Sequence, residues 1–449
     1  MKRFIDTVKN IWAIEELREK ILLTLGLLLI YRLGSNVVLP GVDTESLGNL
    51  QSQADGGLIG ILNAFTGGAF ANASILALGI MPYISASIII QLLGMAVPSI
   101  QKMQKEGESG RRKLNQITRI LTIGITMAQA PGYVANLKVQ GVVPTVGPEM
   151  FWILSIVVLT AGTIFAMWLG ERITDKGIGN GISLLIMVGI IASLPQAFLQ
   201  ELVSKIDQGG GLVLFVVEIA ALIIVILLSV ALVQAVRRIP VQYAKRTTGG
   251  RTFTGNMARQ YIPLKVNAAG VMPIIFAQAI MFIPVTILQY TAGGGEEASA
   301  SASWLITVFS DIQGFWYNFF FAVMIILFTY FYTAIQVNTN QMAEDLKRNG
   351  GFVPGIKPGK ATAEFLDTVL SRITLPGSIF LAILAILPAF AMIAGVNTQF
   401  AYFYGGTSLL IMVGVVLDTL QQIESYLLNR HYDGLMKNGK LKGRAVSAF

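Results

Sequence analysis

The residue types that usually do chemistry are scarce in this sequence. It contains no cysteine, and its one histidine, His431, lies near the polar C-terminal end. Disulfides, thiolate chemistry and cysteine-based metal sites are therefore excluded, and so is histidine-dependent catalysis within an apolar core. Charged residues interrupt the apolar segments at a few points: Arg32, Glu218, Asp418 and Glu424. We predict a protein that is not an enzyme, with no catalytic site, no metal site and no cofactor.

Asp418 lies nearest to the middle of an apolar segment and is the strongest candidate for chemistry. An ionisable residue at membrane depth can relay protons or bind a transported ion. Asp418 has no obvious second acid or basic partner close by in the sequence. Two interpretations stay open: an inverted-repeat secondary transporter that uses Asp418, and a protein in which Asp418 serves helix packing or ion pairing.

The composition is that of a protein with many membrane-spanning helices. Of the 449 residues, 54% are hydrophobic and 13% are charged, against about 25% charged in an ordinary soluble domain. The mean hydropathy is +0.65. The chain has no G-x-x-x-x-G-K-[ST] nucleotide-binding sequence, so we expect a partner to supply the energy for any driven process.

Long apolar runs predict ten membrane-spanning helices, since about 20 apolar residues cross the hydrocarbon core. Of the 33 lysine and arginine residues, 30 fall on one side of these spans, which places both termini in the cytoplasm. The runs are long and rich in Leu, Ile and Ala, so no strands are expected. The predicted spans are residues 21–39, 74–97, 117–137, 151–170, 178–199, 212–236, 267–290, 315–336, 373–395 and 405–428.

The second and seventh spans contain a repeated sequence. ALGIMPYISASIII, which starts at Ala77, and AAGVMPIIFAQAIM, which starts at Ala268, agree at 7 of 14 positions without gaps. Because the two copies are five spans apart, the second half of the chain enters the membrane with opposite polarity. Inverted repeats of this kind place a pathway between their halves. Pro82 and Pro273 each remove a helical hydrogen bond, so both helices are expected to bend there.

The predicted fold is therefore an all-α polytopic membrane protein with two inverted five-helix halves. Residues 1–20 are expected to form a cytoplasmic amphipathic helix, 21–200 the first half, 201–428 the second half and 429–449 a cytoplasmic tail. Residues 56–70, GGLIGILNAFTGGAF, read as an apolar helix that is too short to cross a bilayer. Glycine pairs bracket this short helix and allow hinges.

Two classes of function fit this architecture: a solute or ion transporter, and a channel for cargo without a fixed chemical identity. Isoleucine dominates the repeat, and an apolar constriction gates by excluding water without favouring one substrate. Isoleucine is also stiff at χ1, so a ring of isoleucines would form a defined collar.

Several motifs resemble the bacterial SecY family, the channel subunits of the Sec protein translocon. They are ALGIMPYISASIIIQLL, KEGESGRRK, GIGNGISLLI, PLKVNAAGVMPIIFA, FVPGIKPG and FYGGTSLLI, and they occur in order along nearly the whole chain. The resemblance implies a protein-conducting channel in the cytoplasmic membrane that secretes unfolded polypeptides and releases apolar segments sideways into lipid. It also implies that residues 56–70 are a plug that closes the channel.

The resemblance carries site residues over to matching positions of this sequence. The implied pore ring is Ile80, Ile84, Ile182, Ile186, Ile275 and Ile411. The implied plug residues are Gly57, Leu58, Ile59, Ile61, Leu62 and Phe65. A lateral gate between spans 2 and 3 and spans 7 and 8 is expected to include Ser85, Gln91 and Asn267.

Two cytoplasmic loops, residues 237–266 and 337–372, are far longer than a connection of about 2–8 residues. The first loop is basic with interleaved aromatic residues, which suits RNA phosphates or an acidic protein face. In the family these loops bind the ribosome and the SecA ATPase, and SecE and SecG are membrane partners; signal peptides, nascent membrane segments and the lipid bilayer are the other contacts. The binding residues we expect are Arg238, Lys245, Arg246, Arg251 and Lys357, the last standing where the family commonly has arginine.

Overall fold

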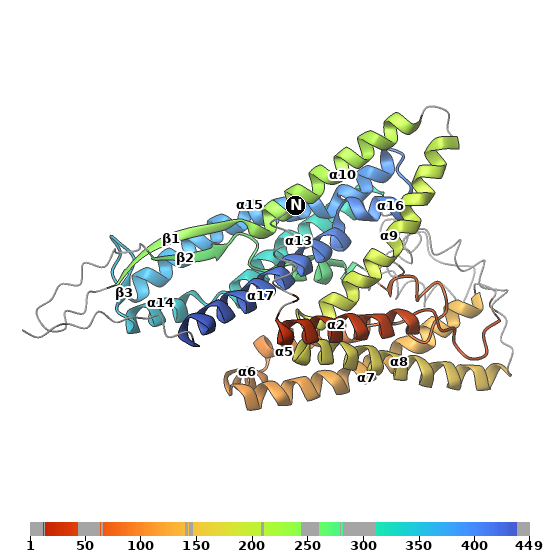
Figure 1. Ribbon diagram of the computed structural model, residues 1–449, viewed down its shortest axis with the longest axis horizontal. Helices are drawn as coiled ribbons and strands as arrows, with labels where there is room; N and C mark the ends of the chain where they lie inside the picture. The colour runs from red at the N-terminus through yellow and green to blue at the C-terminus, as the bar shows by residue number, and fades with distance from the viewer. Residues whose placement is uncertain are drawn as a thin grey trace, which may run out of the picture. The chain divides into compact units, whose positions relative to one another are not determined.

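The computed structural model is mostly helical and divides into two compact units (Figure 1). Unit 1 comprises Met1–Pro195 and Val415–Phe449, and unit 2 comprises Gln196–Gly414. The structure describes residues 14–43, 66–139, 147–207, 211–243, 260–278 and 313–437, together with residues 12, 63, 142, 280, 281 and 311.

Unit 1 is built mainly from long helices. Its helices are α2 (Glu15–Gly34), α5 (Met81–Ala96), α6 (Pro98–Lys105), α7 (Glu108–Val139), α8 (Pro148–Lys176), the first part of α9 (Gly181–Asp207) and the last part of α17 (Gly406–Lys437). Helices α5, α6 and α8 begin with a proline in the first turn, where the missing N–H is no loss. Helix α7 packs on α5 and α8, and α8 packs on α2 (Figure 1).

The start of the predicted second span is wrong, because residues 67–80 form turns and α5 begins only at Met81. Gly79 has φ 52°, in the left-handed region, which ends any helix arriving from Ser74. Pro82 then stands in the first turn of α5, so it starts the helix rather than bending it. Pro273 likewise lies in the first turn of the helical residues 272–278.

The turn segment before α5 is tied to its surroundings by backbone bonds. Val38 and Ser74 form an antiparallel bridge, with N–H···O distances of 2.8 Å from Leu39 to Ala73 and 2.9 Å from Ile75 to Val37. The segment also packs into an apolar core formed with α7 and α8. Buried members of this core include Leu39, Ala73, Ala77, Tyr133, Val134, Leu137, Phe151 and Leu159.

Unit 2 contains helices and a small sheet. Its elements are the rest of α9, α10 (Gly211–Gln234), β1 (Val236–Tyr243), β2 (Gln260–Lys265), α13 (Phe315–Gln336), α14 (Thr339–Arg348), β3 (Gly351–Phe352), α15 (Lys360–Ile393), α16 (Thr398–Ala401), the 3-10 turn η2 (Tyr402–Tyr404) and the start of α17. Helix α15 packs on α13, α14 and α10.

The sheet corrects the prediction of an all-α fold. Its three strands run in the order β2-β1-β3, and both pairs are antiparallel (Figure 1). Ile239 of β1 and Leu264 of β2 are buried with Val353 and Leu366, next to exposed Arg238 and Lys265. This alternation is the pattern of a half-buried strand. It covers only a few residues within a basic loop, so reading the sequence by long apolar runs missed it.

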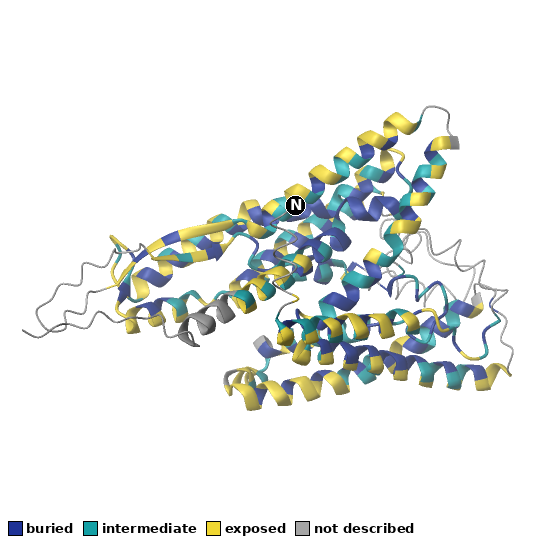
Figure 2. Ribbon diagram, in the orientation of Figure 1, coloured by how far each residue is buried: buried dark blue, intermediate teal, exposed yellow. Residues whose placement is uncertain are grey.

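Six described helical segments are long and apolar enough to cross a membrane: Pro148–Lys176, Gly181–Ile206, Gly211–Gln234, Phe315–Arg348, Lys360–Ile393 and Gly406–Leu427. The pair α5 and α6, bent by 104°, would make a seventh span. Many exposed residues of these helices are large and apolar, most clearly on α10, where Val213 is 75% exposed. Figure 2 shows the exposed positions of α10 in yellow. A surface of this kind fits lipid, so the chain is a multi-pass membrane protein. The count of ten spans stays a prediction.

A buried ion cluster joins three parts of unit 2. The Lys205 ammonium of α9 lies 2.9 Å from a carboxylate oxygen of Glu218 on α10 and 3.4 Å from one of Glu201, and it donates to the Gly395 carbonyl at 2.9 Å. The other Glu201 oxygen accepts from the Asn397 N–H at 2.8 Å, just before α16. All three charged side chains are less than 9% exposed. The cluster therefore holds the ends of α9 and α10 to the connection between α15 and α16.

Replacing the central lysine should destabilise unit 2 strongly. Lys205→Met leaves two buried carboxylates without a counter-charge, and breaking a buried pair in this way costs about 3–5 kcal/mol. Lys138→Met is the matched control, because Lys138 is exposed and forms no ion pair within the described residues, its ammonium lying 5.1 Å from the ring centroid of Trp152; we expect it to cost less than about 1 kcal/mol. Thermal unfolding of the purified protein measures both, and equal effects would contradict this role of Lys205.

Candidate functional site

The two copies of the repeat share one backbone conformation. Gly79 has φ 52° and its counterpart Gly270 has φ 64°, both left-handed. The Ile84 N–H donates to the Ile80 carbonyl at 3.1 Å, and the equivalent Ile275 N–H donates to Val271 at 3.4 Å. The repeat found in the sequence is thus also a repeat in the structure, in which a turn is followed by the start of a helix. Ile84 and Ile275 therefore occupy equivalent positions in the two copies.

Two of the predicted ring residues lie one helical turn apart at the start of α5. Ile80 is the residue before the helix and is 4% exposed, whereas Ile84 is half-buried. Residues four apart share a helix face. Because α5 begins directly after the turn at Gly79, this turn determines on which face of the helix Ile80 and Ile84 lie.

A second pair, Ile182 and Ile186, lies at the start of α9. Asn180 caps this helix, because its side-chain oxygen accepts from the N–H groups of Ile182 at 3.2 Å and Ser183 at 3.3 Å. Gly181 lies so close to the Gly170 carbonyl of α8 that a Cβ there would collide with it. The cap and this close contact fix where α9 begins, and hence where both isoleucines lie.

The loop before α9 is held from three sides. The Ile178 N–H donates to Thr24 of α2 at 3.1 Å, the Gly179 N–H to Gln422 of α17 at 2.9 Å, and the Gly181 N–H to Thr174 of α8 at 2.9 Å. The sequence motif GIGNG, residues 177–181, therefore connects α8 to α9 and is hydrogen-bonded to α2, α8 and α17.

The remaining two ring residues belong to unit 2. Ile275 is half-buried, and Ile411 of α17 is 2% exposed. Four ring residues thus lie in unit 1 and two in unit 2. The ring as a whole stays a prediction.

The predicted gate residues are polar groups in apolar surroundings. The Ser85 hydroxyl donates to the Met81 carbonyl of its own helix at 3.2 Å, and Gln91 lies 3.5 Å from the Ser87 hydroxyl. Asn267 is buried, and its side-chain oxygen has no hydrogen-bond partner within the described ranges. The gate itself stays a prediction.

The predicted plug falls largely outside the described residues. Gly57, Leu58, Ile59, Ile61, Leu62 and Phe65 all lie there. What the structure describes of residues 56–70 is Asn63 and the segment from Thr66 to Phe70, which lead into the turns before α5.

The predicted loop residues are described in part. Arg238 is exposed on β1 opposite Pro263 of β2, and Lys357 is exposed in the turn before α15. The Lys357 carbonyl accepts from Thr362 at 2.9 Å, which fixes the turn. Lys245, Arg246 and Arg251 lie outside the described residues.

Within the described residues, each ionisable candidate either has a structural partner or is exposed. Arg32 donates to a backbone carbonyl, Glu218 belongs to the Lys205 cluster, and Asp418 and Glu424 are exposed on α17. No group of three or more His, Asp or Glu side chains that could hold a metal occurs within the described residues.

The sequence indicated neither the partners of Glu218 nor the ion pair of Arg119 on α7 with Glu171 on α8, at 2.6 Å, because these residues are far apart along the chain.

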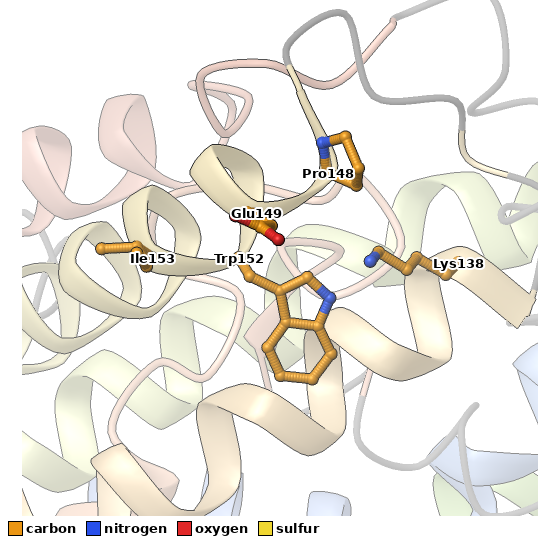
Figure 3. A pocket seen from close by; sticks show the side chains of 5 residues that line it. All are labelled: Lys138, Pro148, Glu149, Trp152 and Ile153. Atoms are coloured by element: carbon orange, nitrogen blue, oxygen red, sulfur yellow. The ribbon is translucent and has the colours of Figure 1, made fainter.

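A surface pocket of about 410 Å³ lies where α7 ends and α8 begins (Figure 3). Lys138, Pro148, Glu149, Trp152 and Ile153 line it. None of the predicted ring, gate or loop residues is among them, so the pocket is separate from the candidate site.

Curated relatives match this chain over nearly its whole length. A "Protein translocase subunit SecY" of Streptomyces scabiei is 42% identical over 94% of this chain and 97% of its own. The protein of the same name from Vibrio cholerae is 42% identical over 96% of both chains, and that from Chlamydia muridarum is 40% identical over 98% and 99%.

Solved structures show the same fold at lower identity. A protein-conducting channel superposes with a TM-score of 0.64 and 19% identity, covering 94% of each chain. Sec61 in a canine ribosome–channel complex from the endoplasmic reticulum superposes with a TM-score of 0.59 and 17% identity, again over 94% of each chain. The sequence profile of SecY matches residues 74–420. This profile, these relatives and the motifs from α5 to α17 show that the chain belongs to the SecY family.

Proposed function

We propose that this chain is the channel through which unfolded polypeptides cross the cytoplasmic membrane and from which apolar segments leave sideways into lipid. One observation carries the proposal: the two matching helix starts present isoleucines, Ile84 and Ile275, where a transporter would need ionisable groups. Membership of the SecY family supports protein translocation as the function.

The isoleucines suit a seal that has no preference for one cargo. An apolar constriction excludes water when it is empty, and it offers no fixed hydrogen bond that would select a side chain. Ile80, Ile84, Ile182 and Ile186 form two pairs, each spaced one turn along a helix. With Ile275 and Ile411 they make the proposed collar, and residues 56–70 make the proposed plug.

Sideways exit needs no energy source of its own. Apolar residues gain about 0.3–0.6 kcal/mol each at mid-bilayer, whereas Asp, Lys or Arg cost roughly 2.5–3.5 kcal/mol. We propose Ser85, Gln91 and Asn267 as gate residues; a hydrogen bond between helices in a membrane contributes only about 0.6–2 kcal/mol. An inserting apolar segment outweighs contacts of that size.

The proposed partners are inferred from exposed basic residues of the predicted cytoplasmic loops. The exposed basic residues Arg238 and Lys357 suit the ribosome and the SecA ATPase, which would supply the driving force. Solved relatives of this fold occur in ribosome complexes. We propose SecE and SecG as membrane subunits, with both termini of this chain in the cytoplasm.

The transporter that uses Asp418 is not favoured. Asp418 is exposed on α17 and takes part in no ion pair within the described segments. A proton-coupled transporter would lose coupling on Asp418→Asn. The channel should keep its rate within about twofold, since a surface substitution away from packed features changes little. Protease-protected precursor in vesicles containing the whole translocon measures this rate, and loss of transport in Asp418→Asn alone, with Glu424→Gln normal, would contradict the passive channel.

Charge reversal on β1 should weaken docking in a position-dependent way. Arg238→Glu replaces attraction to phosphate by repulsion, so we expect ribosome affinity to fall by roughly tenfold, with a shallower dependence on salt. Arg237→Glu changes the net charge equally, but adjacent strand residues point to opposite faces. Co-sedimentation with ribosomes at several salt concentrations measures both, and equal losses would mean that net charge, not Arg238, governs binding.

A further inference from the structure

The pocket between the end of α7 and the start of α8 is lined by two opposite charges that the channel function does not use. Both the Lys138 ammonium and the Glu149 carboxylate line it, and both residues are exposed. Neither takes part in an ion pair within the described part of the chain. Two exposed charges that share one pocket without pairing suit a ligand that carries both signs.

Two hydrogen-bond donors lie beside each other in this pocket. The Lys138 ammonium is 5.1 Å from the ring centroid of Trp152, and Figure 3 shows the indole nitrogen on the side of the ring nearest to Lys138. The indole N–H can only donate, and it has no acceptor among the described residues. A phosphate group offers several acceptor oxygens, so an ammonium and an N–H in this arrangement can both donate to it.

The pocket lies at the end of a membrane-spanning helix. Helix α8, Pro148–Lys176, has 29 residues and is about 43 Å long at ~1.5 Å per residue. A bilayer with its headgroup layers is ~40–45 Å thick, so both ends of α8 lie among lipid headgroups. Tryptophan is enriched in this layer because its ring is apolar and its N–H is polar. Trp152 and the pocket are therefore at the depth of the headgroups.

An exposed apolar stripe runs from the pocket along α8. Ile153 forms part of the pocket wall and is 65% exposed. Val157, Ala161 and Phe165 follow at steps of four residues, all of them exposed, and residues four apart share a helix face. From Ile153 to Phe165 the stripe is about 18 Å long, against roughly 15 Å for the hydrocarbon depth of one leaflet. A water-soluble ligand would leave this stripe uncovered, whereas the acyl chain of a lipid covers it.

We propose that this pocket binds the headgroup of a phospholipid that carries an amine beside its phosphate, such as phosphatidylethanolamine. The Lys138 ammonium and the Trp152 N–H donate to the phosphate oxygens, and the Glu149 carboxylate accepts from the amine of the headgroup. An acyl chain lies along the stripe that begins at Ile153. The pocket volume of about 410 Å³ is within the range of small-molecule sites, ~300–1,000 Å³. This inference does not depend on the proposed channel function, because it uses only α8 and the end of α7.

Native mass spectrometry of the intact translocon, stripped of lipid and then given phosphatidylethanolamine or phosphatidylglycerol, tests the proposal. The native complex should bind phosphatidylethanolamine more tightly, since phosphatidylglycerol has the phosphate but no amine. Lys138→Gln should weaken the binding of both lipids by about fivefold, because it removes a partner of the phosphate. Glu149→Gln should weaken phosphatidylethanolamine by a similar factor and should not weaken phosphatidylglycerol, because it removes only the partner of the amine.

Lys176→Gln is the matched control. It removes the same charge from an exposed residue in the last turn of α8, at the opposite end from the pocket, so the affinity for phosphatidylethanolamine should stay unchanged. Equal affinities of the native complex for the two lipids, or a Glu149→Gln variant that weakens both or neither, would overturn the proposal. Displacement of the bound lipid by soluble glycerophosphoethanolamine at equal concentration would overturn the assignment to a membrane lipid, since the acyl chain would then contribute nothing.

Discussion

Irregular backbone inside a bilayer is stable only where the protein itself satisfies the free N–H and C=O groups, and the segment before α5, which we propose lies at membrane depth, has many of these groups bonded. Extended residues 37–39 pair with Ala73 and Ile75, Tyr133 bonds to Phe70, and Arg32 bonds to Gly67. These contacts fix the segment that leads into the turn at Gly79, after which α5 begins. The positions of Ile80 and Ile84 depend on them, and so does the attachment of the proposed plug.

The same need to satisfy polar groups explains the charges that the apolar helices carry. Lys205 is shared by two carboxylates and a carbonyl, and Arg32 binds the backbone, so neither is free to take up a transported proton or ion. Their partners are structural, which is consistent with the apolar pathway that we propose. A passive channel of this kind needs an external motor, in keeping with the missing nucleotide-binding sequence.

Much of this fold could be predicted from the sequence, because long apolar runs and a Gly-x-Met-Pro repeat are local signals. Helices α8, α9, α10 and α13 lie where the runs predicted them. The start of α5 could not be predicted from hydropathy, since it depends on a left-handed glycine, and the β1–β2–β3 sheet was hidden by its short strands. The partners of Arg32 and Lys205 are distant in the sequence, so only the structure brings them together. The collar stays a proposal that rests on family resemblance, because its residues, for example Ile84 and Ile411, belong to different units.

The central claim is that polypeptide passes along these isoleucines, and the absence of cysteine gives a clean background for testing it. Single substitutions Ile84→Cys, Ile186→Cys and Ile411→Cys, with a secretory precursor carrying one cysteine arrested midway, allow disulfide cross-linking in the intact translocon. Val213→Cys on the exposed face of α10 is the control. The account predicts cross-links at all three isoleucine positions and none at Val213. Cross-links at none of the three, with the complex assembled and the precursor arrested, would contradict it.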